Sequence, residues 1–336
     1  MTRPAAGHRR LAAAAAVAAV TITLTSVAAS LVLIGLTLRD DGSATFDVFT
    51  LGGLSLGGTY AIVGWLVASR RQDNVIGWVF LGIGLSQSLA GLATLASIYG
   101  LIVRPGSLPL AAEWSWLATW IWAPGFTLLV TFSLLLFPDG HLPSARWRPI
   151  AWLSVVTMAL LVIPPAIAAW PSRGIALTGS RDALSNTLGL AEQIQFFGLL
   201  VSSAVAIASI ASIVTRFRRS SGRERQQLKW FTYAAIPEIS FVFASAFVTM
   251  PPFVGVVMAP LLPVAIGIAI LRYHLYEIDR LISRTIAYAV VTGVLVATFG
   301  VMILLLQAVL APFTQGQTIA VAASTLAVFA LSQPIM

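Results

Sequence analysis

Long apolar runs alternate with short polar gaps along almost the whole chain. Most of these runs reach the roughly 20 residues that an α-helix needs to cross a hydrocarbon layer about 30 Å thick. The runs cover residues 11–38, 48–69, 75–103, 114–137, 149–170, 194–215, 230–250, 253–271, 285–310 and 318–331. The pattern predicts an all-α, polytopic integral membrane helical bundle with about ten transmembrane helices, in a range of about 8–10.

The ends of the chain limit this map. Residues 1–10 form a basic leader, and the run after it is about twice as long as the apolar core of a cleaved signal peptide. This length favours a retained first span, although residues 27–30 would be a passable cleavage site. We therefore expect a transmembrane domain over residues 11–331 and a short, truncated end at 332–336, with no soluble domain.

The boundary between the seventh and eighth runs is weak. Only Pro251 and Pro252 separate them. Residues 230–271 therefore form either a tight helical hairpin or one broken pair that does not fully cross the membrane.

Arginine and lysine are concentrated in alternate gaps. If the N-terminus is cytoplasmic, 16 of the 20 basic residues fall in inside segments. The four outside are Arg39, Arg104, Arg173 and Arg181. This bias follows the positive-inside rule and predicts that the N-terminus and the C-terminus both lie in the cytoplasm.

Composition narrows the class of protein and the kind of partner. The chain is 58% hydrophobic and only 10% charged, against roughly 25% charged residues in soluble domains. The formal net charge is +8, but the basic residues lie in short gaps between spans, so anionic lipid headgroups are expected as partners and nucleic acid is not. The absence of cysteine excludes disulfides, thiolate metal sites and cysteine nucleophiles.

Four polar motifs lie at the predicted cytoplasmic edges of the spans. They are RQDNVIGW at 71–78, LFPDGHLP at 136–143 with RWRP at 146–149, GRERQQLKW at 222–230, and residues 273–284 with Thr285 and Tyr288. In order and spacing they resemble the N-terminal membrane region of bacterial two-component sensor histidine kinases, from about residue 60 to the end. His141 departs from the family, whose PDGRLP-like loop has arginine there. The chain also stops at Met336, where family members continue into phosphoacceptor and ATP-binding domains.

The resemblance implies a sensory or anchoring module in the bacterial plasma membrane, without a catalytic output of its own. It also implies a homodimer, while the ligand stays unspecified. We expect no catalytic residues, cofactor or metal, because the sequence has no Gly-rich nucleotide loop and its histidines lack metal-ligand spacing. A small-solute transporter is the alternative, and a membrane enzyme ranks third, because no Asp, Glu or His cluster marks a membrane face.

Glu238 is the one acidic residue well inside an apolar run, eight residues past Trp230 and so about 12 Å deep. An ionised carboxylate is costly there, so we expect it to be protonated or hydrogen-bonded to a polar residue on another helix, such as Gln87. Pro237 should kink this helix. Glu238 is then either a proton- or ligand-responsive switch or a neutral, packed acid with structural hydrogen bonds.

The basic loop after the sixth run either contacts anionic lipid or only enforces topology. Its basic residues are Arg216, Arg218, Arg219, Arg223, Arg225 and Lys229.

Near the outer end of the fourth run, Trp116 and Trp120 share a helix face, where they line an external ligand pocket or anchor the helix in the interface. Gly53-x-x-x-Gly57 allows another backbone to approach closely. We expect that backbone to belong to another helix of the same bundle in preference to a second copy of the chain.

Residues 272–284 connect two apolar runs and have the pattern of a helix lying in the interface. This segment is either a juxtamembrane coupling element or a passive loop. The residues that would carry the coupling are Leu275, Glu277, Ile278, Arg280 and Arg284.

Overall fold

The structure is a computed structural model that describes residues 6–41, 46, 48–70, 74–169, 185–245, 248 and 251–271. The chain divides into two compact units, Met1–Leu275 and Tyr276–Met336, and every described residue belongs to the first. All secondary-structure elements in this part of the chain are helical. Seven helical segments of the described part are long and apolar enough to cross a membrane. The part of the chain that is described therefore has the architecture of a multi-span helical bundle.

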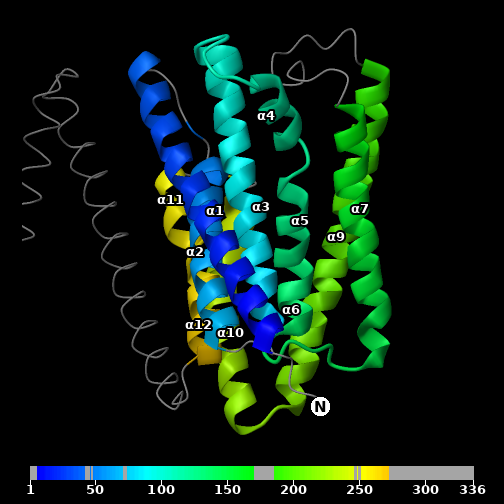
Figure 1. Cartoon of the computed structure of the whole chain (residues 1–336). Helices are drawn as coiled ribbons and strands as arrows, with labels where there is room; N and C mark the ends of the chain where they lie inside the picture. The colour runs from blue at the N-terminus through cyan, green and yellow to red at the C-terminus, as the bar shows by residue number, and fades with distance from the viewer. Residues whose placement is uncertain are drawn as a thin grey trace, which may run out of the picture. The chain divides into compact units, whose positions relative to one another are not determined.

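The helices follow one another along the chain and run side by side, mostly antiparallel to their neighbours (Figure 1). They are α1 (Ala6–Asp40), α2 (Val48–Arg70), α3 (Ile76–Ile98), η1 (Tyr99–Val103), α4 (Ala111–Ala118), α5 (Trp122–Thr127), η2 (Leu128–Phe132), α6 (Ser133–Leu136), η3 (Ala145–Trp147), α7 (Arg148–Ala168), α9 (Ser185–Arg219), α10 (Gly222–Ser245), α11 (Pro252–Met258) and α12 (Leu261–Leu271). A helix satisfies its backbone hydrogen bonds internally, which is why apolar runs of this length adopt it in lipid.

The helices match the first six predicted runs and refine the next two. The fourth run is assembled from α4, α5, η2 and α6, and the other five are covered by α1, α2, α3, α7 and α9. α10 covers most of the seventh run and stays helical through Pro237, but it is not among the seven candidate spans. The eighth run is a helix broken at Ala259 and Pro260. The ninth and tenth runs lie outside the described residues.

The main core lies where α2 and α3 meet α10 and α12. Its fully buried large side chains include Tyr60, Phe80, Phe137 and Ile266. Helices in lipid gain little from apolar burial against one another, so close backbone packing through small residues supplies much of the attraction.

Glycines let α2 and α3 approach closely. A Cβ on Gly64 would lie 2.7 Å from the backbone nitrogen of Leu81, and a Cβ on Gly57 would lie 3.0 Å from that of Ser88. A Cβ on Gly53, in contrast, would meet nothing within 4 Å. The prediction of close packing within the bundle is therefore confirmed for Gly57, but Gly53 takes no part in it.

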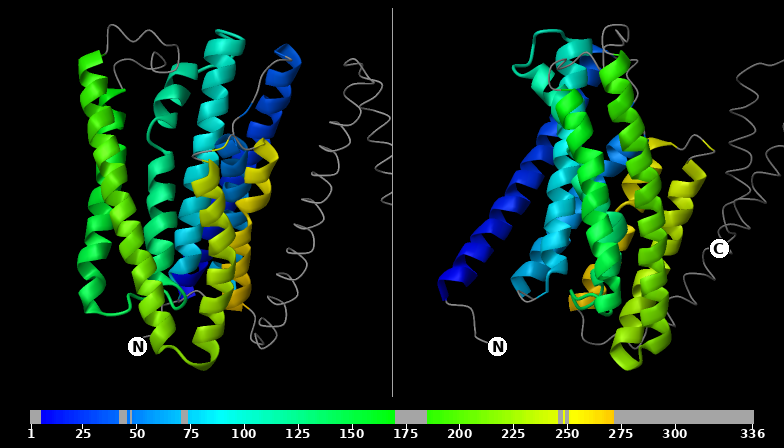
Figure 2. Two further views of the ribbon diagram at one scale, coloured as in Figure 1. Left: turned by 180° about the vertical axis from the view of Figure 1, so that it is seen from behind. Right: turned by 90° about the vertical axis from the view of Figure 1, so that its right-hand side faces the viewer.

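One end of the bundle, the lower end in Figure 1, gathers helix starts and helix ends, and the views in Figure 2 agree. They are the starts of α1, α3, α7 and α10 and the ends of α2, α6, α9 and α12. This end, here named the basic end, comprises residues 70, 74–76, 136–148, 216–229 and 271. It holds the basic residues Arg70, Arg146, Arg148, Arg216, Arg218, Arg219, Arg225 and Lys229. Arg39 and Arg104 lie at the opposite end. The alternation of charge seen along the sequence is thus an alternation in space.

Candidate functional site

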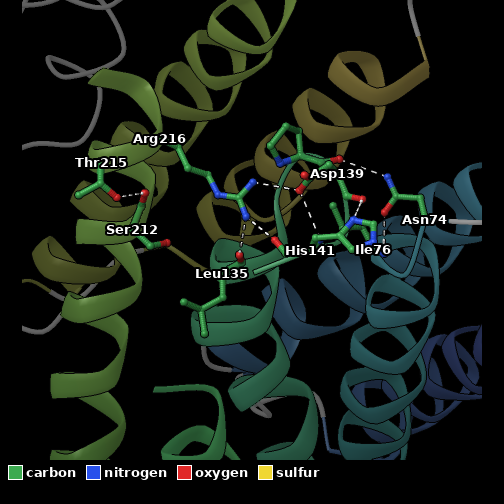
Figure 3. A network of polar contacts seen from close by, with 9 residues as sticks. Asn74, Ile76, Leu135, Asp139, His141, Ser212, Thr215 and Arg216 are labelled. Atoms are coloured by element: carbon green, nitrogen blue, oxygen red, sulfur yellow. Dashed lines mark hydrogen bonds and ion pairs between the residues drawn. The ribbon is translucent and has the colours of Figure 1, made fainter. Parts of the chain in front are cut away.

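A polar network at the basic end joins three segments that are far apart in the sequence (Figure 3). Its centre is Arg216, near the end of α9, whose side chain is only 8% exposed. Arg216 Nη1 donates to Asp139 Oδ1 at 2.9 Å, and Nη2 donates to the carbonyl of Leu135 at 3.2 Å and to the carbonyl of His141. The planar guanidinium presents its donors as a rigid fork. One side chain therefore holds the loop after α6 against α9.

This network also satisfies the end of α6. The last four carbonyls of a helix have no partner within it. The N–H of Gly140 donates to the carbonyl of Leu136 at 2.7 Å, and Arg216 takes the carbonyl of Leu135. Arg216 therefore serves as a C-terminal cap supplied by another helix, with a positive charge where the helix dipole favours one.

Asn74 links the same loop to the start of α3. Its Oδ1 accepts from the N–H of Ile76 at 2.9 Å, and its Nδ2 donates to the carbonyl of Pro138 at 3.2 Å. Gly140 makes this approach possible, since it has a φ of +82° and a Cβ there would lie 2.9 Å from Asn74 Oδ1. Two of the four motifs, 71–78 and 136–143, are thus in direct contact.

The third motif, residues 222–230, ties α10 to its neighbours. Gln227 Nε2 donates to the carbonyl of Ala269 in α12 at 2.8 Å. Leu228 is fully buried in the core, and Arg225 lies 5.3 Å from the centre of the Phe217 ring. The motif therefore has contacts on both sides, to α12 and to α9.

The fourth motif lies outside the described residues. This includes every residue predicted to act in juxtamembrane coupling, namely Leu275, Glu277, Ile278, Arg280 and Arg284. Their predicted role stays a prediction.

The predicted lipid-contacting residues do not behave as one group. Arg218, Arg219 and Arg225 are exposed, and Lys229 is half-buried. The side chain of Arg223 is not among those described. Arg216 corrects the prediction, because its guanidinium is buried and occupied by protein acceptors. The sequence contains no sign of which arginine in the loop turns inward.

Glu238 lies beside the start of α12, near the backbone N–H of Leu262. The N–H groups at a helix start have no partner within the helix. The proposed partner Gln87 is wrong, because its Nε2 donates to the carbonyl of Trp122 in α5 at 3.1 Å. Glu238 Oε2 and the hydroxyl of Tyr60 are buried without a hydrogen-bond partner in the described part of the chain.

Trp116 and Trp120 are in contact, with ring centres 5.3 Å apart in an edge-to-face arrangement. Trp116 Nε1 donates to the carbonyl of Ala166 near the end of α7 at 2.8 Å. Both side chains are half-buried. The pair therefore packs α4 against α7, while its predicted role as a pocket or a membrane anchor stays a prediction.

Sequence reasoning assigned no role to Asn74 or Asp139, which hold the network together. The turn sequence Pro138-Asp139-Gly140 is a signal that could have drawn attention to them. Sequence reasoning also missed a small cluster at the opposite end of the bundle, where the hydroxyl of Tyr99 donates to Asp40 Oδ2 at 2.9 Å. Hydrogen bonding to Tyr99 and the nearby Asp40 carboxylate raise the pKa of Arg104.

No family model, no curated protein and no solved structure matches the chain. The resemblance to sensor histidine kinases therefore rests on the four motifs alone. Within the described ranges, no group of three or more His, Asp or Glu side chains is placed to hold a metal ion. The arrangement at the basic end is suited to joining helices rigidly and to presenting positive charge.

Proposed function

We propose that this chain is the membrane-embedded sensory or anchoring module of a signalling system of the sensor histidine kinase type, and is not itself an enzyme. The observation that carries the proposal is the contact between motifs 71–78 and 136–143 and the end of α9 through Asn74, Asp139 and Arg216. Two of the segments that resemble a signalling family, 71–78 and 136–143, thus form one network with the end of α9. A rigid network of this kind passes movement of one span to the others.

The proposal includes a bacterial plasma membrane location, about ten spans, both termini in the cytoplasm and a homodimer. The gathering of basic residues at one end of the bundle supports this orientation. Anionic headgroups of the inner leaflet are the partners that such an end favours.

A chimera tests the signalling role. The phosphoacceptor and ATP-binding domains of a sensor kinase are joined after Met336, and autophosphorylation is measured in membrane vesicles. Arg216→Gln should change the rate by about fivefold or more, since coupling free energies are of order 1–3 kcal/mol. Arg218→Gln, two residues away and exposed, is the matched control and should leave the rate unchanged. Equal rates in all three chimeras, at equal amounts of inserted protein, would contradict a sensory role.

A small-solute transporter is the second candidate, favoured by the break between α11 and α12. Transporters often place binding sites at discontinuous helices near the middle of the membrane, and here Glu238 and Tyr60 lie beside the start of α12. Flux of protons or solutes into proteoliposomes that is lost in Glu238→Gln would favour this alternative. Proteoliposomes with no flux above protein-free vesicles would count against it.

A further inference from the structure

A cleft opens at the basic end between the loop after α6 and the turn from α9 to α10. Its volume is about 600 Å³, within the range of small-molecule sites. Arg146 and Trp147 line it on one side, Arg219 and Ser220 line it on the other, and Arg216 lies between them. We propose that this cleft binds a phosphate-bearing anion, and that the headgroup of an anionic phospholipid is its occupant. This inference rests on the orientation and the lipid partner of the proposed function, but not on its signalling role.

The charges in the cleft favour an anion. Arg146 and Arg219 are exposed and form no ion pair within the part of the chain that the structure describes. Asp139 also lines the cleft, but its carboxylate is paired with Arg216. Glu224 offsets one of the remaining positive charges, so the lining keeps a net positive charge. Guanidinium groups bind the oxygens of a phosphate in pairs, as they also bind a carboxylate, whereas a halide offers no paired acceptors.

Arg216 has a different role from the other two arginines. Its Nη hydrogens are engaged by protein acceptors, and the side chain is 8% exposed. Arg216 therefore sets the position of the loop and adds positive charge to the lining of the cleft. Direct contacts with the phosphate are assigned to Arg146 and Arg219, which come from opposite sides of the cleft.

The surroundings favour a lipid over a soluble phosphate. The adjoining turns of α9 and α7 expose apolar side chains, including Val214 and Ile210 on α9 and Trp152 on α7. Such residues give acyl chains a surface next to the headgroup. Trp147 in the lining is the kind of amphipathic ring that settles at headgroup depth. Basic pockets between membrane helices on the cytoplasmic side are known to bind anionic headgroups.

The decisive experiment compares two double variants that remove the same charge. Delipidated full-length protein in neutral detergent is titrated with phosphatidylglycerol, and bound lipid is counted by native mass spectrometry. Arg146→Gln with Arg219→Gln should weaken binding by about tenfold or more. The control, Arg148→Gln with Arg218→Gln, alters exposed arginines of the same two segments that do not line the cleft, and should change binding by less than about twofold.

The outcomes distinguish a defined binding site from non-specific electrostatic attraction to the basic end. Equal weakening in both double variants, or no weakening in either, would overturn the proposal. Competition by glycerol 1-phosphate, with the same dependence on Arg146 and Arg219, would keep the cleft but assign it to a soluble phosphate ester; failure to compete would assign it to lipid. Unfolding temperatures of both variants check that each is folded.

A measurement on the unsubstituted protein does not depend on any variant. Phosphatidylglycerol with a photoactivatable headgroup is incorporated into vesicles containing the protein and cross-linked peptides are sequenced. Cross-links concentrated in residues 139–147 and 215–224 are expected. Cross-links spread evenly over the other segments of the basic end would contradict a defined site.

Discussion

At the scale of the residue, Arg216 shows how a buried charge is accommodated at the end of a membrane bundle. Its guanidinium has one carboxylate and two carbonyl acceptors. Burying a charge is costly unless it is paired and hydrogen-bonded, and here the acceptors come from a helix end and loop that need donors. The arginine and the loop therefore stabilise each other.

Replacement of Arg216 by glutamine should lower the free energy of unfolding by about 2–3 kcal/mol, because three charge-assisted hydrogen bonds are lost. Asp139→Asn should cost less, about 1 kcal/mol, because the Asp139 side chain is 58% exposed and Arg216 keeps both carbonyl acceptors. Denaturant unfolding in detergent micelles measures both. Arg218→Gln, a surface change, should stay within about 0.5 kcal/mol, and equal stability of the Arg216 and Arg218 variants would contradict a stabilising network.

Gly140 and Gly106 form a matched pair for testing the close approach of the loop to Asn74. Both have positive φ values, +82° and +78°, so alanine is strained at either by about 1–2 kcal/mol. Only at Gly140 would the new Cβ also meet neighbours, 2.9 Å from Asn74 Oδ1 and 3.1 Å from the nitrogen of Val75. Gly140→Ala should therefore destabilise the protein by about 1 kcal/mol or more beyond Gly106→Ala. Equal losses in thermal or denaturant unfolding would show that the contact is unimportant.

At the scale of the element, α2 and α3 pair through glycines, whereas α11 and α12 are two halves of a broken helix that contacts with other helices keep in place. Ser55 Oγ in α2 donates to the carbonyl of Val256 at 2.8 Å, and Glu238 in α10 lies beside the start of α12. Each helix in this region forms from its own apolar run, but its position depends on contacts with two others. Broken helices need such partners because their freed backbone groups have no water to bond in lipid.

Alanine at Gly84 should separate α2 from α3, because its Cβ would lie 2.7 Å from the backbone nitrogen of Ala61. Backbone atoms cannot move aside as a side chain can, so a loss of about 1–3 kcal/mol is expected. Gly53→Ala, on the same helix pair with nothing within 4 Å of the new Cβ, should be neutral or stabilising by up to about 1 kcal/mol. Unfolding in detergent distinguishes them, and similar effects at both positions would show that the close packing does not stabilise the pair.

At the scale of the whole molecule, the two ends of the bundle differ in charge. The loop after α6, the turn between α9 and α10 and the end of α2 gather at the basic end. The proposed cytoplasmic location of this end rests on the positive-inside rule, and the proposed lipid cleft depends on it as well.

Cysteine accessibility tests this sidedness without interference, because the chain has no native cysteine. Ser107 and Ser221 are exposed at opposite ends. In intact cells, a membrane-impermeant thiol reagent should label Ser107→Cys, whereas Ser221→Cys should be labelled only after permeabilisation, since the inner leaflet retains positive segments. The reverse pattern would invert the map and with it the signalling proposal.

Sequence reasoning reached the segments of the candidate site but not its contacts. It placed residues 71–78, 136–143 and 222–230 at one membrane edge, and the structure brings the described ones, from Asn74 onward, to the same end. It could not pair Arg216 with Asp139, which lies 77 positions away. It also chose Gln87 as the partner of Glu238, whereas Gln87 donates to the carbonyl of Trp122. The wrong choice arose because both Gln87 and Glu238 lie within runs, and periodicity does not specify which faces meet.

The multi-span helical character of this chain follows from its order of residues alone, because a membrane helix closes its own hydrogen bonds and needs only an apolar run of sufficient length. The alternation of arginine-rich and arginine-poor segments between the spans is also a property of the sequence alone, since the charge of each segment does not depend on how the helices pack. The inward turn of Arg216, the position of Glu238 beside α12 and the cleft between Arg146 and Arg219 depend instead on how helices rotate and shift against each other. Packing between distant segments sets those rotations, so they became visible only in three dimensions.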